Sequence, residues 1–135
     1  MANVDEYFNG SCSLYLDKVE YKRISENDSE VVLNVNDNID IKLDDNCQGI
    51  EGIVTRRLSF EPQSLFEITV SFGVFLEFKD EYKGINNLDL DELKEEFLDG
   101  QSVITNIVMS RISLLISQLT SSYGERPVVT PPSIM

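Results

Sequence analysis

One stretch decides the fold of this chain: Phe66-Glu67-Ile68-Thr69-Val70-Ser71-Phe72-Gly73-Val74-Phe75-Leu76-Glu77-Phe78. Large apolar side chains occupy every second position of it, from Phe66 through Val70 and Val74 to Phe78. Successive side chains of a β-strand point to opposite faces, so an alternation of this length predicts a strand with one buried face. Polar side chains such as Glu67 and Thr69 would lie on the opposite face.

Three further strands are expected before this one, at residues 11–24, 30–43 and 50–60. The second alternates Val31, Leu33 and Val35, and later Ile39 and Ile41, with polar residues, which predicts one buried and one solvated face. Asn, Asp, Gly, Pro and Ser residues at 25–29, 44–49 and 61–64 predict the turns between them. Residues 1–10 are expected to form a polar lead.

Two helices are expected after the fourth strand. Asp89 followed by Glu92 resembles a capping box that opens a short acidic helix. Apolar residues at three- and four-residue steps then predict a long helix over residues 103–119, with Ser102 as N-cap and Gly124 as the residue that ends it. Residues 127–135 form an apolar tail bounded by prolines. The order predicts a single α+β domain, residues 1–135, in which a four-stranded antiparallel sheet carries both helices on one face.

Composition argues against catalysis and against nucleic-acid binding. The chain of 135 residues has 24 acidic and 11 basic residues, a net charge of −13, which repels phosphates. It has no histidine, the usual general base and zinc ligand, and no glycine-rich phosphate loop. Cys12 and Cys47 do not have the spacing of a metal site. We therefore expect a protein that is not an enzyme and uses no metal or cofactor.

The N-terminus is acidic and polar, unlike a secretory signal, and no run approaches the roughly 18 apolar residues of a membrane span. We therefore expect a cytoplasmic protein without a membrane partner, with Cys12 and Cys47 reduced. Some apolar residues lie outside the alternating rows of the strands and the apolar face of the long helix. If they are exposed together, they would form a contact patch. These are Leu65, Phe75, Tyr82, Val128, Val129, Ile134 and Met135. Ordinary core packing is the alternative explanation.

Four segments, in order, resemble the SecB protein-export chaperones. They are residues 14–21 (LYLDKVEY), 30–35 (EVVLNV), 66–75 (FEITVSFGVF) and the Ser-Arg-Ile-Ser core at 110–113, which precedes a proline-bounded tail. The resemblance implies the same sheet-and-helix fold, assembled as a dimer or tetramer. It also implies ATP-independent holding of unfolded polypeptides in apolar grooves.

By this resemblance, two groups of residues acquire expected roles. The client-binding candidates are Leu33, Leu58, Phe60, Leu65, Phe66, Phe72, Phe75, Phe78, Tyr82, Val128, Val129, Ile134 and Met135. The oligomer-interface candidates are Leu16, Val19, Tyr21, Ile112, Ser113, Leu115 and Ile116.

The chain departs from the family where family members bind the SecA motor. Lys18 and Lys22 stand at acidic positions of the first strand, and Ile68 at an acidic position of the fourth. These changes argue against docking to a SecA-type motor. SecB-like chaperones that serve the antitoxin of a toxin–antitoxin pair are therefore an open alternative, as is an oligomeric adaptor that is not a chaperone.

Overall fold

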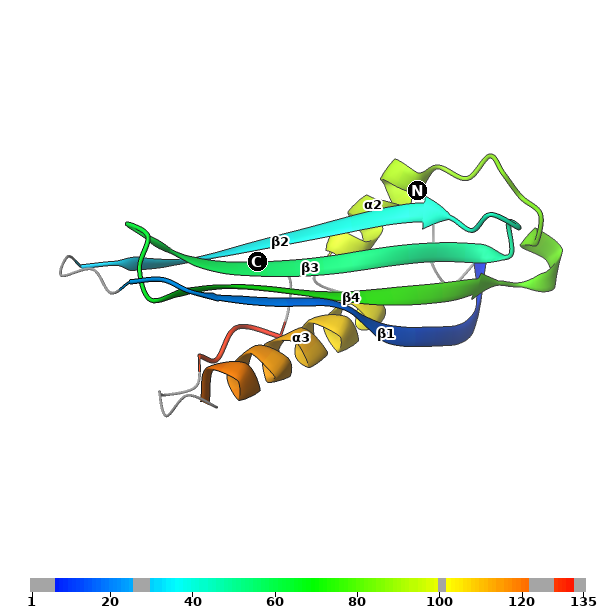
Figure 1. Cartoon of the computed structure of the whole chain (residues 1–135). Helices are drawn as coiled ribbons and strands as arrows, with labels where there is room; N and C mark the ends of the chain where they lie inside the picture. The colour runs from blue at the N-terminus through cyan, green and yellow to red at the C-terminus, as the bar shows by residue number, and fades with distance from the viewer. Residues whose placement is uncertain (1–6, 26–29, 100–101, 122–127, 133–135) are drawn as a thin grey trace.

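The computed structural model describes residues 7–25, 30–99, 102–121 and 128–132 (Figure 1). Four long strands come first in the chain, and the helices follow. The elements are β1 (Phe8–Arg23), β2 (Val32–Leu43), β3 (Gly49–Glu61), β4 (Phe66–Phe78), the short 3₁₀ helix η1 (Asp80–Tyr82), α2 (Leu90–Leu98) and α3 (Val103–Ser121). This is the predicted α+β architecture, and the four strands lie close to their predicted bounds.

The strands form one antiparallel sheet in the order β1-β4-β3-β2. β4 therefore lies inside the sheet, with β1 on one side and β3 on the other. The register pairs Val70 with Arg56 and Ile68 with Leu58, so the alternating rows of neighbouring strands share a face. Ile68 and Val70 are completely buried, as the alternation predicted.

The first strand begins earlier than predicted and is irregular. Phe8, expected in a polar lead, is buried in β1 and stacks on Phe78 with their ring centroids 5.4 Å apart. The pairing with β4 shifts once between Phe8 and Cys12 and again between Leu16 and Lys18. The second shift is a β-bulge, which lets Leu16 and Val19 face the same side although they are three residues apart.

Both helices cover the same face of the sheet, which we call the helix face (Figure 1). The Asp89 side chain accepts a hydrogen bond from the Glu92 amide, so the predicted N-cap of α2 is confirmed. The Thr105 amide donates to Ser102 Oγ at the start of α3. Gly124, the predicted end of the long helix, lies outside the described residues.

α3 packs against the sheet through its buried side, which includes Val108, Ile112 and Ile116. By length and composition alone, α3 is also apolar enough to span a membrane, and 33% of its most apolar 18-residue stretch is buried inside the protein. The helix meets this criterion by its average composition, since polar residues such as Asn106 and Arg111 interrupt its apolar run. The absence of a membrane partner stays a prediction.

On the opposite, outer face of the sheet, two neighbouring strands come into close contact at a glycine. Tyr15 of β1 lies across Gly73 of β4 and donates a hydrogen bond of 2.9 Å to Glu51 of β3. A Cβ atom at Gly73 would come within 2.0 Å of the Tyr15 ring, so only glycine leaves room for this crossing. Burial, followed by the bond to Glu51, raises the Tyr15 pKa to about 12.

Candidate functional site

One pocket lies between α2, α3 and the helix face, and its chemistry is apolar. Side chains from β2, β3, β4 and both helices line it, among them Ile39, Val74, Phe97 and Val108. Its polar side chain is Thr105, whose hydroxyl is already donated to the Phe97 carbonyl. Within the described residues, no three His, Cys, Asp or Glu side chains are gathered as metal ligands. The pocket therefore offers hydrophobic contact and no reactive group.

A half-exposed apolar cluster lies on the helix face where β3 turns into β4. We call Tyr21, Leu33, Phe60 and Phe66 the turn-end cluster. Leu33 pairs with Phe60 across β2 and β3, and the Phe60 ring meets the edge of the Phe66 ring at 5.1 Å. Tyr21 stacks on Phe66 at 5.9 Å from the other side. Leu33 remains 38% exposed, so the cluster extends beyond the core as accessible surface.

Other client-binding candidates do not join this cluster. Leu58 and Phe78 are completely buried, so as contact residues they were wrongly chosen; they are core of the folded chain. Phe72 is half-buried on the helix face. Phe75 points to the outer face, because the alternation of β4 places it opposite its neighbours.

The remaining candidates lie in turns and in the tail. Leu65 is 38% exposed in the turn beside the turn-end cluster. Tyr82 packs edge-on against Tyr7, at a centroid distance of 5.0 Å, after β4 has ended. Val128 is half-buried against the core and Val129 is exposed. Ile134 and Met135 lie outside the described residues.

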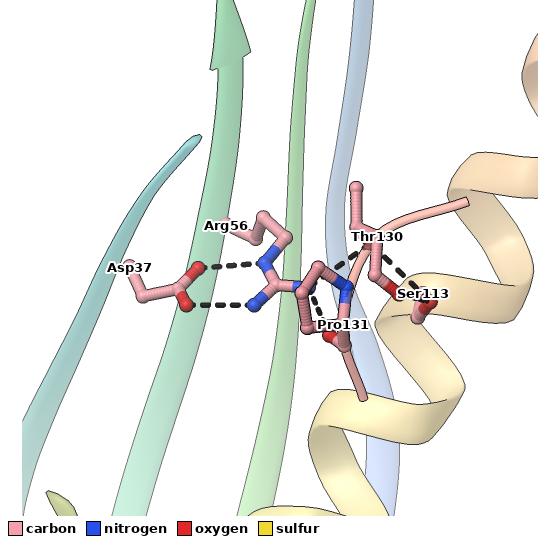
Figure 2. A network of polar contacts seen from close by, with 5 residues as sticks. All are labelled: Asp37, Arg56, Ser113, Thr130 and Pro131. Carbon is pink, nitrogen blue, oxygen red and sulfur yellow. Dashed lines mark hydrogen bonds and ion pairs between the residues drawn. The ribbon is translucent and has the colours of Figure 1, made fainter. Parts of the chain in front are cut away.

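The tail is bound between α3 and the sheet (Figure 2). The Arg56 guanidinium donates to the Thr130 hydroxyl at 3.0 Å and to the Pro131 carbonyl. Ser113 of α3 donates its hydroxyl to the Thr130 carbonyl, and the Val128 amide donates to Thr120 Oγ1 at 2.7 Å. Residues 128–132 therefore run antiparallel to α3 and bond to both layers.

Arg56 is itself fixed by a buried ion pair. Asp37 of β2 receives two hydrogen bonds of 2.7 Å from the guanidinium, and both side chains are 0% exposed. The two residues face each other in the register of β2 and β3. Neither residue was among the predicted site residues, although each interrupts an apolar row: Asp37 between Val35 and Ile39, and Arg56 between Val54 and Leu58.

The oligomer-interface candidates separate into exposed and buried residues. Leu16 is 54% exposed and Val19 is 38% exposed, and both face the helix side at the edge of the sheet. Ile112 and Ile116 are completely buried against the sheet, and Ser113 is buried against the tail, so choosing these three was wrong. Tyr21 and Leu115 are half-buried.

The solvent-exposed side of α3 carries apolar residues that the sequence pattern had grouped with those now buried against the sheet. Ile107 is 46% exposed and Leu114 is 58% exposed, and seven residues apart they lie on one side of the helix. Both belong to the run of apolar residues that predicted the helix. Because that run covers more than one face, periodicity alone could not tell which part would be left in solvent.

The residues at the family's motor-docking positions lie on both faces of the sheet. Lys18 and Lys22 lie on the outer face of β1, where Lys18 pairs with Glu20 at 3.3 Å. Ile68 is completely buried under the helices. The expectation that these residues disfavour docking to a SecA-type motor stays a prediction.

The comparisons with known proteins give a structural match and no sequence match. No family model matches the chain, and no curated protein matches it in sequence. The fold is similar to that of a SecB-like chaperone from Mycobacterium tuberculosis, solved in complex with a ChAD peptide from the HigA1 antitoxin. The TM-score is 0.66 at 8% sequence identity, over 88% of this chain and 86% of that one. The chain therefore has the fold of the SecB-like chaperones.

Proposed function

We propose that this protein is an ATP-independent cytoplasmic chaperone that holds unfolded polypeptide segments on the helix face of its sheet. The observation that carries the proposal is the turn-end cluster, in which aromatic rings and Leu33 form accessible surface next to an edge strand. Holding an unfolded chain shifts its folding equilibrium by mass action and requires no catalytic group.

The edge strand adds a second mode of contact. Among the described strands, β2 pairs only with β3, so its other edge is available to an extended client. Strand addition supplies main-chain hydrogen bonds that do not depend on the client's sequence, and Leu33 and Phe60 supply apolar contact beside them. The net charge of −13 keeps such a surface soluble.

The exposed row of β1 and the outer side of α3 support assembly into a dimer or tetramer. Large apolar side chains are exposed at both places: Leu16 and Val19 at the β1 edge, and Ile107 and Leu114 on α3. Exposed apolar patches on a protein surface commonly mark contacts with another protein. In this proposal a second copy of the chain covers them, and the turn-end clusters of the copies stay open to clients.

A dedicated client is the second candidate. The M. tuberculosis protein of similar fold was solved with a peptide from an antitoxin, which supports a client segment that belongs to one particular partner protein. Both candidates use the same surface. They differ in selectivity, because a general holdase accepts many unfolded sequences and a dedicated chaperone accepts one.

The test is suppression of aggregation of an unrelated unfolded protein, followed by light scattering. Leu33→Gln replaces an apolar contact of the turn-end cluster and should weaken client binding about fivefold, a change of about 1 kcal/mol. Val32→Gln is the matched control, because Val32 is the neighbouring residue on the opposite face and is 65% exposed.

Equal suppression by the two variants would show that the cluster does not bind clients. No suppression by the unaltered protein would leave the dedicated chaperone or a plain adaptor. These two are then separated by whether the protein binds one partner in its unfolded or its folded form.

A further inference from the structure

The tail segment is held by side chains of both the sheet and α3, mostly through its main chain. Residues 128–132 read Val-Val-Thr-Pro-Pro, an apolar segment without charge, and they are held along α3 with hydrogen bonds from three side chains. We call the side chains Arg56, Ser113 and Thr120 the tail seat. Figure 2 shows Arg56 and Ser113 approaching Thr130 from opposite sides.

The tail seat contacts main chain and one hydroxyl. Arg56 donates to the Pro131 carbonyl, Ser113 donates to the Thr130 carbonyl, and Thr120 accepts from the Val128 amide. The hydroxyl of Thr130 is the bonded side-chain group, accepting from Arg56 and donating to Ser113. Val129 is 78% exposed, so its side chain contributes little. Proline at the next position has no amide hydrogen to leave without a partner.

The tail seat is built without help from the tail. Two hydrogen bonds of 2.7 Å to Asp37 fix the guanidinium of Arg56, and both side chains are fully buried. Ser113 and Thr120 are on α3, which packs on the sheet through its own buried residues. A donor set fixed in this way binds with little loss of side-chain freedom.

We propose that the tail seat is a peptide-binding site, filled by the chain's own tail, that also accepts extended client segments of the pattern β-branched aliphatic residue, any residue, Thr or Ser, Pro. This proposal rests on the proposed function and deepens it, because it names the class of segment selected. The tethered tail competes with clients at an effective concentration in the millimolar range. Clients therefore bind strongly only when their segment matches the tail or when the tail is weakened.

The test uses a fluorescent peptide with the sequence of residues 127–135, titrated with the full-length chain and followed by anisotropy. Thr130→Val in the protein is nearly isosteric and removes the two bonds of the Thr130 hydroxyl, one accepted from Arg56 and one donated to Ser113, while the main-chain bonds of the tail remain. It should raise the affinity for the peptide about tenfold, because the tail occupies the seat less. The same Thr→Val change made in the peptide should lower its affinity about tenfold.

Val129→Thr, in either the protein or the peptide, is the matched control and should change nothing, because that side chain points to solvent. Circular dichroism checks that the Thr130→Val protein is folded, and Thr130→Ala serves as the second variant. Opposite effects of one substitution in the two molecules are expected from competition and not from a tail that only stabilises the fold.

Two results would overturn the proposal: a peptide that binds neither Thr130 variant at millimolar concentration, or a Thr→Val peptide that binds as well as its parent. Aggregation suppression that depends on Leu33, without peptide binding, would remove this proposal and leave the holdase. Peptide binding without aggregation suppression would support the tail seat and remove the general holdase.

Discussion

Replacing Asp37 with alanine should leave a buried cation without its counter-charge. The side chains of Asp37 and Arg56 are both 0% exposed, and two hydrogen bonds of 2.7 Å join them. In Asp37→Ala, the guanidinium keeps its bonds to the neutral oxygens of Thr130 and Pro131 and loses the two charge-assisted bonds to the carboxylate. Removing one partner of a buried pair costs about 3–5 kcal/mol, because the other charge stays desolvated.

Urea unfolding at a fixed protein concentration measures this loss. A domain of this size is stable by roughly 5–15 kcal/mol, so the variant should retain a fold with a small margin. With a urea dependence of about 2 kcal/mol per M, a loss of about 4 kcal/mol lowers the midpoint by about 2 M. Glu20→Ala is the control, because the Lys18–Glu20 pair has side chains 48% and 65% exposed and should contribute less than about 1 kcal/mol.

The double variant Asp37→Leu with Arg56→Met separates charge from packing. Apolar residues of similar volume often replace a buried ion pair without loss, so its stability should recover to near that of the unaltered protein. Its tail, deprived of the Arg56 donor, should exchange the Val128 amide hydrogen faster. An Asp37→Ala variant that loses less than about 1 kcal/mol would refute the reasoning, because the pair would then be hydrated and not buried.

Three further outcomes are expected, from a surface substitution, from a pH titration and from a substitution at Gly73. Leu114 is 58% exposed, so Leu114→Glu should lower the assembly mass measured by light scattering and leave the circular dichroism spectrum unchanged. The control is Val32→Glu, at a residue of β2 that is 65% exposed, and it should keep the native mass. Equal masses of the two variants would contradict the assembly surface. In an ultraviolet absorbance titration, one of the five tyrosines should ionise at about 12, and Tyr15→Phe should remove that step. Because the folded chain holds the Tyr15 proton more tightly than the unfolded chain, this stabilisation is present below about pH 10 and is lost as the pH rises towards the folded pKa. Gly73→Ala, whose Cβ would lie 2.0 Å from the Tyr15 ring, should displace that ring and return the Tyr15 pKa towards its ordinary value.

The fold could be predicted because the interior strand β4 has an unmistakable sequence pattern. The alternation from Phe66 to Phe78 is long and regular because β4 has a strand on each side and helices over one face. β1 was harder, since its bulge changes the parity between Leu16 and Val19, and a pattern of strict period two cannot follow such a change.

The site was less predictable, because it depends on register. Asp37 and Arg56 each stand alone in an apolar row, and that signal is visible in the sequence. Only the pairing of β2 with β3 shows that the two charges meet. Leu58 and Phe78 were mistaken for contact residues because a strand pattern gives the face of a residue and not what covers it.

The bulge in β1 has a consequence for fibre growth. A sheet edge with evenly spaced amide and carbonyl groups can template one strand after another, as in amyloid. Asp17 is the extra residue between the Leu16–Phe72 and Lys18–Ser71 pairs, so an added strand finds regular spacing on only one side of it. The bulge therefore interrupts repeated strand addition along this edge, while Leu16 and Val19 still share the helix face.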